Sequence, residues 1–190
     1  MRAPHGSAIS WSDVQKLFDE FDYTAYRLET LQHYAAEYES EAFARFAASE
    51  REGAPPPLSD TDWGARVRAA TAEGRRFDRV HVVAEPLTDY IRFECAWGYR
   101  RNSAAGERIR ILPVKQGEWP EAIPAFDYWL FDSHKLLLMN YADDGSLVST
   151  EIVDDPAEIV RANVWRDRAL HLSIPFTEYA AQFDDYMRPR

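Results

Sequence analysis

The sequence contains almost no cysteine and no long apolar run. Its single cysteine, Cys95, can form neither an internal disulfide nor a cysteine-based metal site. The histidines are scattered without the spacing of metal ligands, so we expect no bound metal. No stretch approaches the roughly 20 apolar residues that span a bilayer, and the N-terminus lacks the apolar centre of a signal peptide. A cytoplasmic protein without a membrane segment is therefore predicted.

The common catalytic and nucleotide-binding motifs are also missing. There is no GxGxxG, no P-loop, no GxSxG and no HExxH. We therefore expect no cofactor, and none of the reaction classes that these motifs serve. Positive charge is scarce as well. The net charge of −10 repels phosphate backbones, which disfavours nucleic acid as a partner.

Apolar and aromatic residues, in contrast, are plentiful. They make up 46% and 14% of the chain, which is enough to bury a core and argues against global disorder. We expect one α+β domain over residues 11–187, preceded by a flexible leader over residues 1–10. The clearest break is GAPPPLSD at residues 53–60, where three prolines after a glycine predict a stiff connector.

Alternating apolar and polar residues predict the strands. They lie in the segments YTAYRLET, RFDRVHVVAE, ERIRILPV, FDYWLFD, KLLLMNYA and SLVSTEIV. The chain from Pro86 to about Asn102 favours a helix between the second and third segments, which makes a β-α-β unit. We predict a mostly antiparallel sheet of about five strands, with flanking N- and C-terminal helices.

The helix EPLTDYIRFECAW carries the most informative pattern. At 3.6 residues per turn, Leu87, Tyr90, Ile91, Glu94 and Trp97 share one stripe. A carboxylate then lies on the face that packs inward, where an unpaired charge costs several kcal/mol. Two interpretations stay open. Glu94 forms a structural ion pair with an arginine of the sheet, or it is a carboxyl of raised pKa that acts as an acid or base.

The predicted strands offer charged partners for this carboxyl. Arg79, His81 and Glu85 share one strand face, which either lines a polar groove or is a solvated outer face. Asp127 begins a strand that is apolar on both faces, and it is either a buried acid or a turn residue. The candidate catalytic residues are Glu94, Asp127 and Arg92. The candidate ligand-binding residues are Arg27, Glu29, Arg79, Glu85, Tyr90, Trp97, Arg110 and Trp129.

Several segments also resemble a known family. FDYTAYRLET, RVHVVAEPLTDYIRFECAW, AGERIRIL and FDYWLFDS are similar to an uncharacterised family of actinomycete proteins, over about residues 15–180. The motif RLET, followed much later by EPLTDYIRFE, is typical of it. The resemblance implies an actinobacterial origin, a single cytoplasmic domain and genes close to helix-turn-helix regulators. It implies no activity.

Three functions are compatible with these observations. The first is a binding or regulatory module whose arginine- and carboxylate-lined cleft takes a small polar or anionic ligand or a partner peptide. Its protein partner would be a regulator of the helix-turn-helix kind. The second is a cofactor-independent enzyme in which Glu94 or Asp127 is the general acid/base and Arg92 or Arg110 orients the substrate. The third is a small effector acting on nucleic acid, against which the negative charge argues.

Overall fold

The structure, a computed structural model, describes residues 2–48 and 62–182. The strands are β1 (Ser7–Ala8), β2 (Thr24–Glu29), β3 (Arg76–Glu85), β4 (Arg108–Lys115), β5 (Asp127–Phe131), β6 (Lys135–Tyr141), β7 (Leu147–Val153) and β8 (Ile174–Pro175). The α-helices are α1 (Trp11–Glu20), α2 (Glu37–Ala47), α3 (Asp62–Ala72), α4 (Asp89–Phe93), α5 (Tyr99–Ala105), α6 (Pro156–Leu172) and α7 (Phe176–Gln182). A π-helix, Glu94–Gly98, joins α4 to α5.

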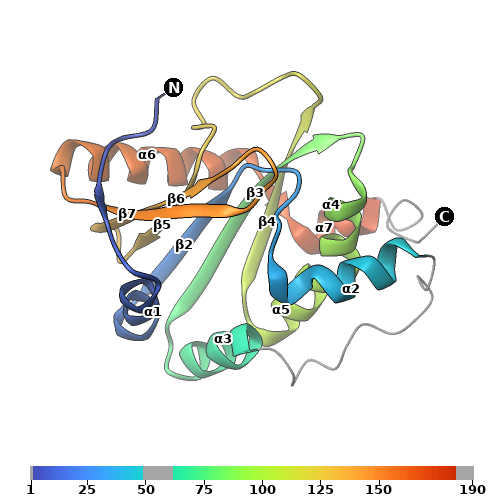
Figure 1. Ribbon diagram of the computed structural model, residues 1–190, viewed down its shortest axis with the longest axis horizontal. Coiled ribbons are helices and arrows are strands. Elements are labelled where there is room, and N and C mark those ends of the chain that lie inside the picture. Colours follow the sequence, from blue (N-terminus) through green and yellow to red (C-terminus); the bar gives the residue numbers. More distant parts are fainter. Residues whose placement is uncertain (1, 49–61, 183–190) are drawn as a thin grey trace.

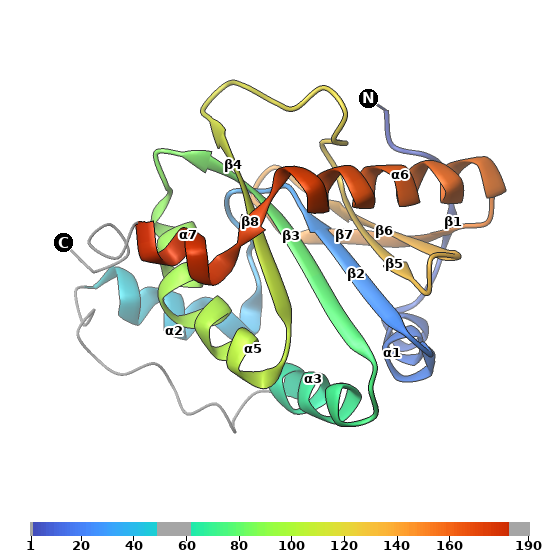
Figure 2. The ribbon, with the colours of Figure 1, turned by 180° about the vertical axis from the view of Figure 1, so that it is seen from behind.

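All eight strands belong to one mixed sheet in the order β1-β7-β6-β5-β2-β3-β4-β8 (Figures 1 and 2). The central strands β2, β3 and β4 are parallel, whereas β5, β6 and β7 form an antiparallel meander. The prediction of a mostly antiparallel sheet of about five strands was therefore wrong. Periodicity identified the strands but not their partners, because β2 pairs with β3 and β5, both far away in the sequence.

Two short strands at the edges of the sheet were missed altogether. Ser7 and Ala8, within the segment predicted as a leader, pair with β7, and Ile174 and Pro175 pair with β4. A two-residue strand shows no alternation, so its pairing depends on a neighbour that only the folded chain supplies. The predicted β-α-β unit is confirmed as β3, the α4–α5 helices and β4.

Helices cover both faces of the sheet (Figures 1 and 2). The long helix α6 lies across one face, which we call the α6 face, and it packs Trp165 against strand residues such as Tyr128. The other helices cover what we call the α2 face. There, one apolar cluster lies under α2, α4, α5 and α7, and a second lies under α1 and α3. No helix in the described ranges is long and apolar enough to cross a membrane.

This two-sided cover corrects one interpretation of β3. The face with Arg79 and His81 is not a solvated outer face, because His81 is fully buried and Val83 joins the cluster under α2 and α4. Parallel strands are typically buried on both faces, and β3 follows that rule. The expected two-sided burial of β5 is confirmed, since all five of its residues are buried.

Local signals fixed the beginnings of the helices, although not at the predicted residues. Ser10 caps α1 by accepting a hydrogen bond from the Asp13 backbone. Thr88 caps α4, so the helix begins at Asp89 and not at the predicted Pro86. The predicted proline connector at residues 53–60 lies outside the described residues.

Candidate functional site

A set of charged and ionisable side chains lies on the α2 face, between its two apolar clusters. Its members, which we call the buried charge network, are Arg27, Glu29, Arg79, His81, Glu107 and Asp127. All are buried except Arg79, whose side chain is 11% exposed. Strand register explains the meeting: β2 and β3 are parallel, so Arg27 lies opposite Arg79 and Glu29 opposite His81. Side chains in such register share one face of the sheet.

At one end of the network, Arg27 pairs with Asp127. The Arg27 Nη2 atom donates to Asp127 at 2.7 Å, and Asp127 also accepts from the Thr30 backbone, the Thr30 hydroxyl and the Tyr34 hydroxyl. Burial raises the pKa of Asp127, and Arg27 and these hydrogen bonds offset only part of that rise. Arg27 also lies over the Trp129 ring at 5.6 Å. Asp127 is thus the predicted buried acid, and not a turn residue.

The Arg27 guanidinium is not fully satisfied. Its Nη1 atom is buried and has no hydrogen-bond partner among the residues that the structure describes. A buried donor without a partner costs about 1–3 kcal/mol, and an ordered water or a ligand oxygen usually meets such a group.

At the other end, Arg79 bridges two carboxylates. It donates to Glu29 at 2.5 Å and to Glu107 at 2.7 Å, and Glu107 also accepts from the Trp63 indole at 2.9 Å. Burial by itself would raise the pKa of Glu29, but attraction to the guanidinium groups of Arg79 and Arg27 outweighs it, and the pKa is lowered to about 2. Glu29 is therefore ionised at neutral pH.

His81 is held in one neutral form by its partners. Its Nε2 atom lies 2.7 Å from the Leu31 carbonyl oxygen, which can only accept, so Nε2 carries the proton. The Nδ1 atom then accepts from the Tyr99 hydroxyl, with which it is in contact. Burial lowers the pKa of His81 despite the nearby Glu29 carboxylate. The ring therefore stays neutral and acts as a fixed hydrogen-bonding group.

Glu94 is a buried carboxyl whose pKa is shifted in the opposite direction to that of Glu29. It is 6% exposed, and no described residue forms a hydrogen bond or ion pair with its side chain, so the predicted arginine pair is absent. Burial raises the pKa of Glu94 well above its usual value, and repulsion from Glu39 and Glu29 adds to the effect. The surroundings of Glu94 therefore favour its protonated form. It begins the π-helix, a feature often found at functional sites.

Two neighbours shape the surroundings of Glu94. Gly98 leaves room for it, because a Cβ atom at position 98 would lie only 2.6 Å from the Glu94 Oε2 atom. Glu39 on α2 accepts a hydrogen bond of 2.8 Å from the Tyr90 hydroxyl. Burial also raises the pKa of Glu39. Two carboxyls of raised pKa, Glu39 and Glu94, thus influence each other beside the ionised Glu29.

The remaining predicted site residues lie apart from the network. Trp97 is buried in the apolar cluster under α2, and Arg92 is half-buried on α4. Glu85 accepts a hydrogen bond of 2.8 Å from the Tyr179 hydroxyl. Arg110 lies on the α6 face, where its Nε atom donates to the Ser173 hydroxyl at 2.9 Å.

Arg110 instead contributes to a surface hollow of about 610 Å³ at the edge of the sheet, beside β4 and β8. Three arginines line this hollow, which we call the arginine hollow: Arg76, Arg108 and Arg110. Asp78, Glu107, Ser103 and Thr177 add polar groups, and Ile109, Leu170, Pro175 and Phe176 add apolar ones. Asp78 is shared by two of the arginines, at 3.9 Å from Arg76 and 3.5 Å from Arg108.

Sequence reasoning missed several residues of these sites. Tyr34 and Tyr99 gave no charge or periodicity signal, and Glu107 precedes its strand. Asp78 and Arg108 were overlooked because only the pairing of β3 with β4 brings them side by side. His81 was noticed on its strand face but not assigned to the site. For Glu39, the helix pattern of α2 gave no sign that its carboxyl approaches Glu94.

Fold and sites together define an α+β domain with a mixed sheet and a buried charge network. A family model described as a domain of unknown function, DUF6879, matches residues 12–181. The chain therefore belongs to this uncharacterised domain family. No curated protein matches the sequence.

Proposed function

We propose that this protein is a binding module for a small anionic ligand, and that the ligand binds in the arginine hollow. The observation that supports this is the excess of positive charge there. Three guanidinium groups face the hollow, while Glu107 is already bonded to Arg79 and Trp63 on the other side of the sheet. Among the described residues that line the hollow, Asp78 is then the one carboxylate left to balance the three arginines.

The contacts of these arginines leave hydrogen-bonding capacity for a ligand. Arg76 and Arg108 approach Asp78 only at 3.9 and 3.5 Å, which is too far for a good hydrogen bond. Arg110 is held by the Ser173 hydroxyl and carbonyl, which fixes its guanidinium in place. Guanidinium groups bind carboxylates and phosphates with two parallel hydrogen bonds, so either anion suits the hollow. Its volume is that of a site for a small molecule.

Calorimetric titration with inorganic phosphate and with phenyl phosphate tests this function. We expect both to bind the full chain, and the variant Arg108→Gln to weaken binding at least about tenfold, as loss of a charge-assisted contact implies. Arg161→Gln is the matched control, because Arg161 is an exposed arginine on α6 that pairs with Glu158. No binding by the unmodified chain, or equal weakening by both variants, would overturn the proposal.

The same proposal extends to the cellular setting. A cytoplasmic actinomycete protein carrying the RLET and EPLTDYIRFE motifs would pass the state of its ligand to a partner protein or peptide, such as a regulator of the helix-turn-helix type. The support is the resemblance of those segments to the actinomycete family. Co-purification of the chain with such a regulator, with and without phosphate, tests this extension.

A second candidate function is a cofactor-independent enzyme, and Glu94 favours it. Glu29 and Glu94 influence each other, yet the pKa of Glu29 is lowered to about 2 while that of Glu94 is raised. Carboxyls whose pKa values are driven apart often divide the roles of base and acid. In this proposal Glu94 donates a proton, and Arg79, not Arg92 or Arg110, is the nearby cation.

The variant Glu94→Gln separates catalysis from structure. The enzyme proposal expects the variant to keep its circular dichroism spectrum and melting behaviour while losing turnover of a substrate found by activity screening. Unfolding of this variant would instead make Glu94 a structural residue, and full turnover by a folded variant would exclude Glu94 as the acid.

A further inference from the structure

The arginine hollow carries more positive charge than its carboxylates balance. Arg76 and Arg108 share the carboxylate of Asp78, at 3.9 and 3.5 Å. Arg110 contacts only neutral groups among the residues that the structure describes, namely the hydroxyl and the carbonyl of Ser173. Three guanidinium charges against one carboxylate charge leave a surplus of two positive charges at the hollow.

Glu107 also lines the hollow but does not remove this surplus. Its side chain is fully buried and lies 2.7 Å from the Arg79 guanidinium, on the other face of the sheet. A closely paired cation and anion largely cancel each other at a distance. The field in the hollow is therefore set by its own arginines and by Asp78.

Strand register brings these charges together. β3 and β4 are parallel, with Asp78 opposite Arg108 and Val80 opposite Arg110. Arg108 and Arg110 are two residues apart on β4, so their side chains leave the same face of the sheet at points roughly 7 Å apart. An anion bound between them can accept hydrogen bonds from both guanidinium groups.

The surplus distinguishes between the two anions that hydrogen-bond geometry leaves open. A carboxylate carries one negative charge, whereas a phosphate monoester carries close to two at neutral pH, because its second pKa is about 6. Electrostatic attraction grows with the product of the charges, so a dianion gains about twice as much as a monoanion in the same position. The charge of the hollow therefore favours the monoester.

We infer that the ligand of the arginine hollow is a phosphate monoester, held through its dianionic group by the three arginines. Its organic part lies against the apolar lining, which includes the partly exposed Leu170 and the exposed Pro175. This inference rests on the proposed binding function of the same hollow and adds the charge and the chemical class of the ligand.

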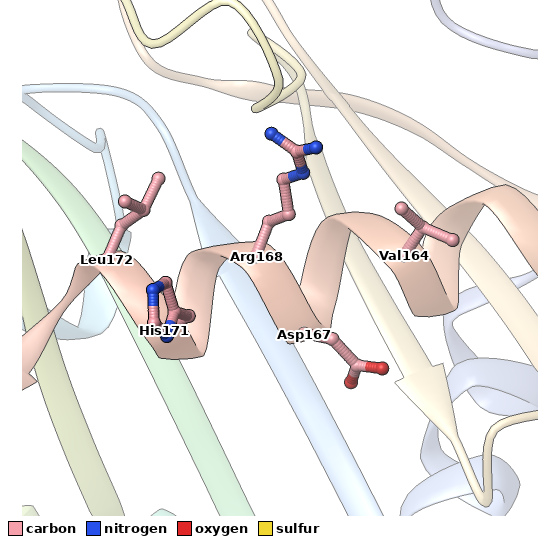
Figure 3. A pocket seen from close by; sticks show the side chains of 5 residues that line it. All are labelled: Val164, Asp167, Arg168, His171 and Leu172. Atoms are coloured by element: carbon pink, nitrogen blue, oxygen red, sulfur yellow. The ribbon is translucent and has the colours of Figure 1, made fainter.

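A depression on the outer side of α6 offers a comparison within the same molecule. Figure 3 shows the residues that line this depression of about 360 Å³: Val164, Asp167, Arg168, His171 and Leu172. Asp167 lies 2.8 Å from Arg166 on the same helix, so Arg168 is the one arginine of the described lining that can add to a surplus. The surplus there is at most one charge, and we expect no preference for a dianion.

Calorimetric titration of the full chain with phenyl phosphate and phenyl sulfate at pH 8 tests the inference. The two compounds share a phenyl group and a tetrahedral head, but the phosphate carries two charges at this pH and the sulfate one. We expect phenyl phosphate to bind at least about tenfold more tightly. Equal affinities would overturn the inference and leave the proposed binding function standing, whereas no binding of either compound would overturn both.

Three variants test the charge count directly. Asp78→Asn raises the surplus, so it should tighten phenyl phosphate by at least about threefold and phenyl sulfate by less. Arg76→Gln lowers the surplus and should reduce the preference for phosphate over sulfate. Arg168→Gln is the matched control, because Arg168 is an exposed arginine of the other depression, and it should change neither affinity.

Circular dichroism of each variant shows whether the fold is kept. Weaker phosphate binding by folded Asp78→Asn, or an unchanged preference in Arg76→Gln, would overturn the inference. If Asp78→Asn does not fold, Arg76→Gln decides alone, since the Arg76 side chain is 54% exposed and its loss leaves the core intact.

Discussion

The Glu94 carboxyl lies in the space where a side chain at position 98 would begin. A Cβ atom built on Gly98 would be 2.6 Å from Oε2 and 2.8 Å from Oε1 of Glu94. Both residues belong to the π-helix, and Gly98 is buried with Glu94. The space at position 98 is therefore limited by the Glu94 carboxyl, and not by a left-handed backbone, since the φ angle of Gly98 is −61°.

The variant Gly98→Ala is expected to destabilise the protein by about 1–3 kcal/mol, because the new methyl group overlaps the Glu94 carboxyl. Urea denaturation of the single variant measures this cost. In a Glu94→Ala background the carboxyl is gone, so the same change should cost much less. Equal costs in the two backgrounds would show that the methyl group is hindered by something other than Glu94.

The pH dependence of stability should reveal the protonated state of Glu94. Its pKa in the folded chain lies well above the usual glutamate value of 4.5, so its stabilising contribution is full below pH 4.5 and is lost as the pH rises through the folded pKa. Glu94→Gln keeps the shape but cannot ionise. We expect the stability of the variant relative to the unmodified chain to increase from pH 5 to pH 9. A flat difference curve would mean that Glu94 is not protonated in the fold.

The contribution of Glu29 to stability should change with pH in the opposite direction to that of Glu94. Its pKa is lowered to about 2, so its contribution is full above pH 4.5 and is lost as the pH falls towards 2. The shift corresponds to a contribution on the order of 3 kcal/mol at neutral pH. Glu29→Gln should therefore lower stability at pH 7 and flatten the acid limb of the stability curve. An unchanged acid limb would contradict the ionised pair with Arg79.

Removal of one member of the buried Arg27–Asp127 ion pair should lower the free energy of unfolding. Asp127→Ala removes the carboxylate that lies 2.7 Å from the buried guanidinium and leaves only Glu29, at 3.7 Å, so we expect a loss of about 3–5 kcal/mol in denaturant unfolding. Glu158→Ala is the control, because it breaks the exposed pair with Arg161, and a loss below about 1 kcal/mol is expected. Similar losses of stability in the two variants would show that the buried pair with Arg27 contributes no more than the exposed pair with Arg161.

Some features of the site were predictable from local patterns. Helical periodicity placed Glu94 on the buried stripe beside Tyr90 and Trp97, and the structure confirms its burial. Alternation in the segment that forms β3 placed Arg79 and His81 on one strand face. These predictions succeeded because the side a residue faces depends on the repeat of its own helix or strand.

Partners could not be predicted in the same way. Among the described residues no arginine forms an ion pair with Glu94, which was one of its two interpretations, and Arg79 instead binds Glu29 and Glu107. Arg110 was expected near Glu94, yet it lies on the α6 face with Arg76 and Arg108. Each of these outcomes depends on which strands are neighbours and in what register, and no repeat within one strand carries that information.

The sequence by itself therefore determined the kinds of element, the side that each charged residue takes on its own element and the residues buried in the helix around Glu94. Only the tertiary structure decided the mixed order of the sheet, the grouping of Arg27, Glu29, Arg79 and Asp127, and the room beside Gly98 for the Glu94 carboxyl. The physical reason is that side-chain direction follows from local backbone geometry, whereas the pKa of a carboxyl follows from burial and from charges brought near by distant parts of the chain.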